Sequence, residues 1–318
     1  MTRQSALIVL SLLAAACASE EKTACTRDTD CPAGYACADG RCLPEVDTGQ
    51  IQQDSAPPDA GTDQHFVYPD GTGPDGGCVP NLDDKVQFEE MTIAPIGVAA
   101  SVIESEEVEV DLAGTDVGGT IHWDLTTVAG KPGTIAVEAV PAWAAQDFPA
   151  DAYATELMSG YGLFFKADLL GVFQKKPSAL QLIGLVSKKE SHTNVVYDTA
   201  LEMPRFPTGL GDHYTTTNVG TGYSTGYTEY NLPWVYDESY TIDVLTRGKL
   251  KLIDGLTLDA LLVRVTHEVS CGVTLATNVA FMFVAECYGT VARIIADEDP
   301  GDELTAVKVE RMWRLAAP

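Results

Sequence analysis

Apolar and polar residues alternate along many short stretches of the chain after residue 78. In EVEVDL (107–112) and TIHWDL (120–125) every second residue is apolar, which places one set of side chains on each face of a strand. Further runs that predict strands are TIAVEAV, YGLFFKA, ALQLIGLVS, YTIDVLT, KLKLI, LLVRVTHEVS, NVAFMFVAECYG, TVARIIA and AVKVERMWRL. One segment, PADAYATELM (149–158), instead predicts a short helix.

Turn residues separate these runs. Gly184, Gly248, the pair Asp254-Gly255 and Gly289 are expected where the chain reverses. NVAFMFVAECY is apolar on both faces, which is typical of a central strand. The alternation in the last run predicts inward-facing side chains at Val307, Val309, Trp313 and Leu315. It predicts outward-facing side chains at Lys308, Glu310 and Arg314. The whole pattern predicts an all-β domain, built as an antiparallel curved sheet, a sandwich or a half-barrel.

The N-terminal residues have the features of an export signal. Arg3 supplies a positive charge, and an apolar run follows over residues 6–16. This run is shorter than the roughly 20 residues that span a bilayer. Three alanines, Ala14 to Ala16, then precede Cys17. The arrangement resembles the lipobox of bacterial lipoproteins, although Ala14 stands where leucine is commoner.

This resemblance implies that residues 1–16 are cleaved as a signal peptide and that lipid is attached to Cys17. Each buried CH₂ of such a lipid contributes about 0.8 kcal/mol to membrane binding. Ala18 and Ser19 follow without the aspartate that retains many such lipoproteins in the inner membrane. The outer membrane is therefore implied, with the protein on its periplasmic or cell-surface face. The alternative is an ordinary secretory signal that leaves Cys17 without lipid.

Residues 17–43 form a small cysteine-rich module. Cys25, Cys31, Cys37 and Cys42 lie among Pro and Gly residues that favour turns over regular elements. An oxidising compartment favours two disulfides, in any of three connectivities. A zinc site is the alternative, but the spacing C-x5-C-x5-C-x4-C lacks the close ligand pairs of zinc modules. The module resembles the small cysteine-rich repeats that follow the lipobox in many bacterial surface lipoproteins.

Residues 44–77 are rich in Asp, Pro, Gly and Gln, which predicts a disordered acidic linker. The globular β-domain is then expected at 78–318. The chain has 46 acidic and 20 basic residues and a formal net charge of −26. Such a chain repels nucleic acid and anionic membrane surfaces. Nucleic acid is therefore excluded as a partner, and the membrane is expected to be reached through the N-terminal lipid.

Three further cysteines, Cys78, Cys271 and Cys287, belong to the β-domain. If the runs around Cys271 and Cys287 form one hairpin, Cys287 lies about ten residues from the turn at roughly 3.3 Å per residue, beyond the reach of a disulfide. A bridge from Cys78 to one of the other two would join the start of the domain to its core. Non-reducing peptide mapping can test that bridge.

The segment GYSTG (222–226) contains the G-x-S-x-G pattern of serine hydrolases. Ser224 would be the nucleophile, with Asp243 and His267 downstream as partners. The nucleophile elbow of those enzymes needs a buried strand before the serine and a helix after it. Here the sequence is Thr-rich before Ser224 and extended after it. We therefore expect Ser224 in a flexible loop, and His267 as a buried or cavity-lining histidine that needs a hydrogen-bond partner.

Other chemistry has no specific pattern. The five histidines are scattered without a pair at metal-ligand spacing, so neither a metal nor another cofactor is expected. The acidic stretch DEDPGDE (297–303) is interpreted as a solvated hairpin tip, with a weak calcium site as the alternative.

These patterns favour a non-enzymatic lipoprotein whose β-domain has a binding, carrier or scaffolding role. Stretches such as FPTGLGDHY and FVAECYGTVARI are diffusely similar to curved-sheet domains of exported lipoproteins. That similarity implies a binding or carrier role. A curved sheet can present an apolar concavity to a small ligand, with Phe164, Phe281 and Phe283 as the candidates for lining it; the alternative is that these aromatics are ordinary core residues. The linker favours another envelope protein as a second kind of partner. The alternative function is a serine hydrolase that uses the GYSTG segment.

Overall fold

The computed structural model describes most of the chain after residue 84. The described residues are 35–38, 41–44, 80, 83, 85–91, 93–156, 169–189, 192–225, 231–234, 236–252, 256–271, 273–301 and 304–316. The chain divides into two compact units, Met1–Asp63 and Gln64–Pro318, and this division falls inside the predicted linker. Cys17, Cys25, Cys31 and Cys78 lie outside the described residues, as do the predicted signal peptide and linker.

In the first unit the structure describes one hairpin, formed by β1 (Tyr35–Ala38) and β2 (Arg41–Pro44). Its register places Cys37 opposite Cys42. The expectation of turns without regular elements is wrong for this part of the module. The connection Asp39-Gly40 is a strong signal for a two-residue hairpin, and it supplies the reason.

Nearly all of the second unit consists of strands. Those that form its main sheet are β4 (Ala99–Asp111), β7 (Lys131–Ala139), β8 (Tyr153–Glu156), β9 (Leu169–Lys176), β10 (Ala179–Ser187), β11 (Asn194–Arg205), β13 (His213–Thr225), β15 (Asp237–Lys251), β16 (Thr257–Ser270), β17 (Thr274–Ala285), β18 (Gly289–Ala296) and β19 (Ala306–Leu315). Shorter strands beside them are β3 (Lys85–Val86), β5 (Thr115–Val117), β6 (Thr120–Asp124), β12 (Thr208–Gly209) and β14 (Asn231–Pro233).

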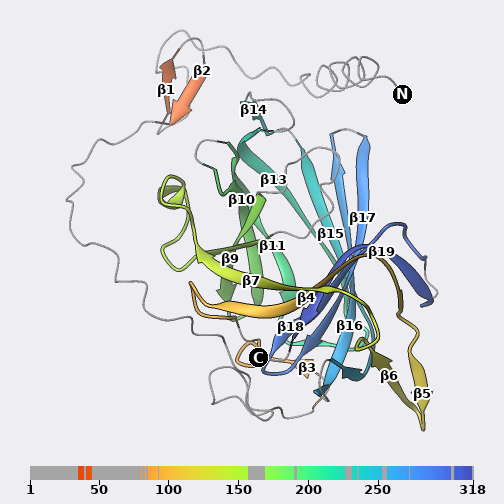
Figure 1. The fold of residues 1–318 in the computed structure, drawn as a ribbon. Coiled ribbons are helices and arrows are strands. Elements are labelled where there is room, and N and C mark those ends of the chain that lie inside the picture. Colours follow the sequence, from red (N-terminus) through yellow and green to blue (C-terminus); the bar gives the residue numbers. More distant parts are fainter. Residues whose placement is uncertain are drawn as a thin grey trace. The chain divides into compact units, whose positions relative to one another are not determined.

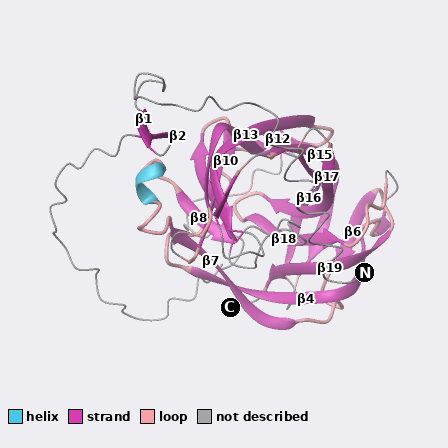
Figure 2. Ribbon diagram, turned by 90° about the horizontal axis from the view of Figure 1, so that it is seen from above, coloured by secondary structure: helices cyan, strands magenta, loops and turns pink. Residues whose placement is uncertain are grey.

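The main sheet is antiparallel and closes on itself. Its order is β13-β11-β10-β9-β8-β7-β4-β19-β18-β17-β16-β15, and β15 pairs again with β13. The all-β antiparallel prediction is confirmed, and the curvature is complete, so the sheet forms a twelve-stranded barrel rather than a half-barrel. Figure 1 shows the strands from the side, and Figure 2 looks down on the ring.

The barrel closes through strand β15. Its first half, Asp237–Asp243, pairs with β13 in antiparallel fashion. Past a bulge at Val244–Thr246, its residues Gly248–Lys251 pair with β6 in parallel. Two separate segments therefore cover the edge of β15 that would otherwise face solvent.

Two glycines predicted as turns lie inside strands instead. Gly248 joins the YTIDVLT and KLKLI runs into the single strand β15, and a Cβ atom on it would lie 2.2 Å from the carbonyl oxygen of Ile121 on β6. Gly184 lies at a bulge of β10, where a Cβ atom would lie 2.3 Å from the carbonyl oxygen of Val195. Both are glycine because a neighbouring backbone passes too close for any side chain.

The helix predicted for PADAYATELM is also wrong in its described part. Residues Tyr153–Glu156 form strand β8 between β7 and β9. Tyr153 and Ala154 are buried in this position, and the gain from sheet pairing and burial outweighs local helix preference. The only helical element among the described residues is a 3-10 turn, Ala145–Asp147. The YGLFFKA run, with Phe164, lies outside the described residues.

Within the described part of the chain, no helix has the length and the apolar character that crossing a membrane requires.

Several strands had no prediction from the sequence. Strands β9, β11 and β13 are among them, and β13 contains the Thr-rich segment HYTTTNVGTGYST. Threonine is β-branched and suits a pleated surface, but its polarity hid the strand from a search for apolar alternation.

Both faces of the sheet are covered along part of the ring. Phe281 and Phe283 of β17 are fully buried on one face, where Phe283 packs edge-on against Trp123 of β6 at a centroid distance of 5.0 Å. Met282 and Val284 alternate with them and face a cavity. Phe281 and Phe283 therefore do not line the concavity; they belong to a core cluster that also includes Trp123, Leu250 and Leu262, as the alternative had it.

The last strand shows the same double coverage. Val307, Val309 and Leu315 are buried as expected, but Arg314, which was expected outside, is only 3% exposed. Its Nη2 donates a hydrogen bond of 2.7 Å to the carbonyl oxygen of Val128, in a loop that covers this face. Burial lowers the pKa of Arg314.

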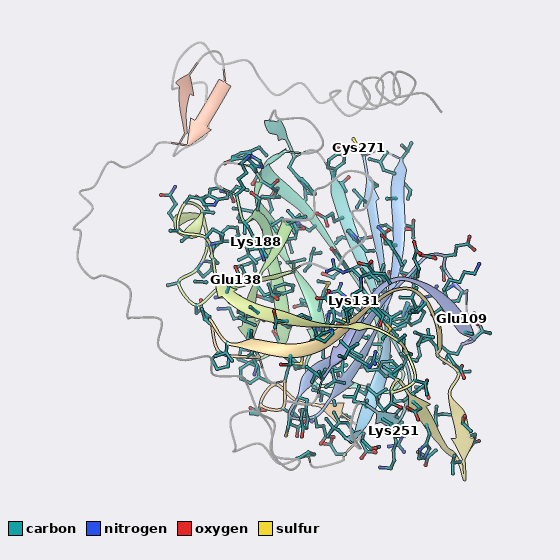
Figure 3. The ribbon with its side chains drawn as sticks, viewed as in Figure 1. Glu109, Lys131, Glu138, Lys188, Lys251 and Cys271 are labelled. Atoms are coloured by element: carbon teal, nitrogen blue, oxygen red, sulfur yellow. The ribbon has the colours of Figure 1, made fainter. Side chains whose placement is uncertain are left out.

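Cys271 and Cys287 are each disulfide-bonded. Val284, just before Cys287, lies opposite Leu261, and Cys271 is ten residues farther along β16. At about 3.3 Å per residue this is on the order of 30 Å, so the two cysteines do not bond to each other. Figure 3 labels Cys271 at one end of the strands and Lys251 at the other.

The bridge from Cys78 to Cys271 or Cys287 stays a prediction. It is favoured by the 2.8 Å hydrogen bond that the N–H of Cys287 donates to the carbonyl oxygen of Glu90, near the domain's start.

We expect Gly248→Ala to destabilise the protein by about 1–3 kcal/mol, because the added Cβ atom must push β6 away from β15. Denaturant unfolding of the full chain measures the change, as a lower midpoint with an unchanged slope. Lys249→Ala is the matched control on the next residue. It removes only the exposed Lys249–Asp259 ion pair, so a loss below about 1 kcal/mol is expected. Equal stability of Gly248→Ala and the wild type would contradict the close approach.

Candidate functional site

The interior of the barrel contains a buried carboxylate that three described side chains contact through hydrogen bonds. Glu238 of β15 is 1% exposed, and its Oε1 accepts a 2.7 Å hydrogen bond from the hydroxyl of Tyr197 on β11. Its Oε2 lies 3.0 Å from His267 Nε2 on β16, and the Tyr240 hydroxyl donates to the same oxygen at 3.4 Å. The rings of His267 and Tyr240 stack with centroids 4.2 Å apart. These four residues are called the Glu238 cluster below.

The Glu238 cluster follows from strand register. Tyr240 and His267 are directly opposite each other on β15 and β16, so their side chains share one face. Glu238 precedes Tyr240 by two residues and therefore points to the same side. His267 is thus a buried histidine with a hydrogen-bond partner, as the sequence led us to expect. The cluster stabilises a unique arrangement of three strands, since breaking one bond leaves a polar group without its partner.

Beside the Glu238 cluster the barrel contains a partly open cavity of about 180 Å³. Strands from all sides of the ring supply its walls, and most of the side chains are apolar. Representative members are Tyr153, Phe173, Met203, Ile242, Val263 and Met282. Tyr153 and Phe173 stack with centroids 5.9 Å apart, and burial raises the pKa of Tyr153, so its phenol stays neutral. Met203 and Met282 are flexible, polarisable side chains that adapt to the shape of a guest.

Two arginines also line this cavity, Arg293 of β18 and Arg311 of β19. Burial lowers the pKa of Arg293 to about 10, and the neighbouring Tyr240 opposes that shift. The guanidinium is therefore still charged at neutral pH. Its Nε is buried and has no hydrogen-bond partner in the structure. The Arg293 side chain as a whole is half-buried, and a cation whose Nε is buried without a partner is unfavourable because of desolvation.

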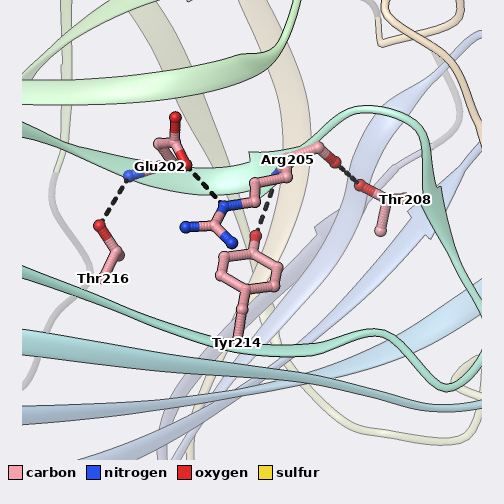
Figure 4. Close-up of polar contacts among 5 residues, drawn as sticks. All are labelled: Glu202, Arg205, Thr208, Tyr214 and Thr216. Atoms are coloured by element: carbon pink, nitrogen blue, oxygen red, sulfur yellow. Dashed lines mark hydrogen bonds and ion pairs between the residues drawn. The ribbon is translucent and has the colours of Figure 1, made fainter.

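Where the main-chain pairing of β11 with β13 ends, side-chain contacts stabilise this part of the cavity wall. Strands β11 and β13 pair only from Asn194 to Tyr197 on β11. Farther along, the main-chain N–H of Arg205 donates a 2.9 Å hydrogen bond to the Tyr214 hydroxyl, and the Arg205 guanidinium lies over the Tyr214 ring. The Nε of Arg205 donates to Glu202 at 2.6 Å (Figure 4). Burial raises the pKa of Tyr214 to about 12. These contacts fix the segment that presents Met203 to the cavity.

The residues proposed for a serine hydrolase do not come together. Ser224 lies in strand β13, opposite Leu232 of β14, so the expected flexible loop is wrong for Ser224, and the described residues around it form strands and not a strand–turn–helix elbow. The register aligns His267 with Tyr240 and Thr216, eight residues from Ser224 along β13, a distance on the order of 26 Å. Asp243 points to the opposite face from Tyr240 and pairs with His213.

The acidic stretch after β18 has a structural partner. Asp299 accepts two hydrogen bonds from Nη2 of Arg264, at 2.6 and 2.8 Å. This ion pair occupies the carboxylate that the calcium alternative needs. Within the described residues, no three His, Cys, Asp or Glu side chains gather as metal ligands.

Sequence reasoning missed Glu238, Tyr197 and Arg293. Extending the alternation of YTIDVLT back by one step would have placed Glu238 on the inward face with Tyr240 and Ile242. A lone arginine inside the apolar run TVARIIA was a second signal, because a charged residue in a central strand faces a special environment. Tyr197 carried no signal, since only the ring closure brings β11 near β15.

Comparisons of the chain with family models, with curated proteins and with solved structures each gave no match. The interior of the barrel is therefore the basis for a functional proposal.

We expect Tyr197→Phe to lower the free energy of unfolding by about 1.5–3 kcal/mol, because the hydrogen bond that is lost goes to a buried charged group. In a Glu238→Gln background the same change should cost less, about 0.5–1.5 kcal/mol, because the bond is then neutral. Denaturant unfolding of the four variants in a double-mutant cycle measures the difference.

Tyr153→Phe is the matched control for this cycle, since Tyr153 is equally buried and makes no hydrogen bond in the structure. If Tyr197→Phe and Tyr153→Phe lower the free energy of unfolding by the same amount, the Tyr197–Glu238 hydrogen bond adds no stability beyond that of a buried tyrosine hydroxyl.

Proposed function

We propose that the protein is a non-enzymatic lipoprotein of the outer membrane whose barrel binds and carries a small apolar molecule. The observation that supports binding is the cavity of about 180 Å³, lined mainly by apolar side chains inside the ring. A concave site lined mainly by apolar side chains, with a few polar groups among them, is the usual form of a small-molecule binding site.

The volume of the cavity limits the size of the ligand. An apolar cavity of about 150 Å³ accepts a benzene molecule. The cavity here is somewhat larger, which favours a ligand of one aromatic ring or a short alkyl chain over a complete membrane lipid. Soft methionine side chains in the wall can adapt to either shape.

The anchor is the second part of the proposal. It is supported by the lipobox-like sequence that ends at Cys17 and by the acidic residues 44–77 that separate Cys17 from the barrel. An anchored carrier of this kind would hold its ligand near the envelope without entering the bilayer itself.

Binding can be tested with hexan-1-ol as a neutral apolar probe. We expect hexan-1-ol to raise the melting temperature of the full chain, because a ligand at 100 times its Kd adds about 2.7 kcal/mol of stability. Val263→Phe fills the cavity and should weaken hexan-1-ol binding at least tenfold, while the unliganded protein keeps its stability. Val117→Phe, on the exposed strand β5, is the control and should bind as the wild type does. Absence of any shift by hexan-1-ol would reject the cavity as a binding site.

The anchor can be tested by membrane fractionation. Cys17→Ala should release the protein from the membrane fraction, because it removes the thiol that takes the lipid. Ala18→Asp is the companion variant, which should keep the lipid but move the protein to the inner membrane. A Cys17→Ala protein that stays in the outer-membrane fraction would show that the lipid is not the anchor.

A further inference from the structure

Arg293 belongs to a row of side chains that crosses the cavity wall. Successive strands β16, β17, β18, β19 and β4 place opposite one another Val263, Met282, Arg293, Trp313 and Glu104. Residues directly opposite on neighbouring strands share one face of the sheet, and all five members line the cavity. The Arg293 guanidinium therefore points into the same space as the apolar side chains around it.

Among the described residues, no group neutralises Arg293. Its Nε has no hydrogen-bond partner there, and none of the ion pairs of this part of the chain includes it. The carboxylate of the Glu238 cluster is already engaged by Tyr197, His267 and Tyr240. A charged group buried in this way is strongly unfavourable unless something else supplies the opposite charge.

Glu104 is the one carboxylate among the described residues of the cavity wall, and its side chain extends away from Arg293. A Cβ atom built on Gly133 would lie 2.6 Å from Glu104 Oε1, so the Glu104 side chain extends across β7. Strand β7 is on the side of β4 opposite to β19 and β18, where Arg293 lies. Arg311 adds a second positive charge to the wall. The described lining residues therefore include two arginines and one glutamate, which is an excess of one positive charge.

On the basis of the proposed function, we infer that the molecule bound in the cavity is a small apolar carboxylic acid in its anionic form, whose carboxylate binds the Arg293 guanidinium. A carboxylate matches the planar fork of N–H donors of arginine and forms short, charge-assisted hydrogen bonds with it. The apolar remainder of the ligand fills the space between Tyr153, Phe173 and Met282. The carboxylate would supply the partner that Arg293 lacks within the protein.

Two classes of molecule fit this description, short-chain fatty acids and single-ring aromatic acids. Both present one carboxylate on an apolar body that fits a cavity of about 180 Å³. Hexanoate and benzoate represent the two sources, and hexan-1-ol has the same chain as hexanoate but no charge.

The test measures the affinity of the full chain for hexanoate, benzoate and hexan-1-ol by isothermal titration calorimetry at neutral pH. We expect at least one carboxylate to bind more tightly than hexan-1-ol. Arg293→Met keeps an apolar side chain of similar length and removes the charge. It should weaken carboxylate binding roughly 10–100-fold and leave hexan-1-ol binding unchanged, as expected for one charge-assisted contact. Tighter hexanoate than benzoate indicates an alkyl ligand, and the reverse order an aromatic one.

Arg247→Met is the matched control, because it removes the same charge from the exposed surface of β15. It should leave the affinity for all three probes unchanged. Arg293→Met should also melt no lower than the wild type without ligand, since it removes an unpaired buried charge. A purely structural role for Arg293 predicts the opposite, a lower melting temperature.

The outcomes separate this inference from the proposed function. If hexan-1-ol binds but Arg293→Met binds hexanoate and benzoate as well as the wild type, the carboxylate inference is wrong and the apolar site stands. If none of the three probes binds to the wild type, both are wrong.

A second measurement needs no variant of Arg293. In the wild-type protein, the ¹⁵N resonance of the Arg293 Nε–H group should shift on addition of the bound carboxylate and should not shift with hexan-1-ol. An unchanged resonance in the presence of saturating carboxylate would overturn the inference even if Arg293→Met failed to fold.

Discussion

The pairing of β13 with β15 is the contact on which the rest of the structure depends. Without it the sheet would be a long curved ribbon with two exposed edges, and such edges promote aggregation. With it, strands that are far apart in sequence become neighbours, and the ring acquires an inside. The parallel pairing of β6 covers the remaining edge of β15, and this requires Gly248, because no other residue lets the two backbones approach so closely.

Closing the sheet into a barrel creates two requirements for the residues inside it. Polar groups that are trapped there need partners, and the Glu238 cluster meets this demand by joining β11, β15 and β16 through one carboxylate. A ring of this size must also be filled, and the described side chains leave a cavity beside the cluster. Tyr240 belongs to both regions, since it bonds to Glu238 and lines the cavity. The fixed cluster thus gives the cavity one rigid wall, and adaptable methionines form others.

The distribution of charge distinguishes the inside of the protein from the outside. The chain has a formal net charge of −26, and Glu90 and Glu238 are the buried carboxylates among the described residues. On the described wall of the cavity Arg293 and Arg311 outnumber Glu104, while the carboxylate of Glu238 lies beside the cavity and is bound within its own cluster. Such a contrast favours a small anion that can be enclosed and shielded from the acidic surface. It does not favour a macromolecular anion, which would have to approach that surface.

The sequence by itself determined the class of the fold, because a period of two residues in runs such as EVEVDL and AVKVERMWRL leaves few alternatives to strands. It also led to the burial of His267, which shares a face with Val263, Val265 and Val269. Tertiary structure alone decided where the chain closes, why Gly184 and Gly248 are strand residues, and that Tyr153 belongs to β8 rather than to a helix. It alone brought Tyr197 to Glu238 and placed Arg293 without a partner in an apolar cavity. The physical reason is that alternation is a local property, whereas register and closure depend on contacts between strands far apart along the chain, which no single segment encodes.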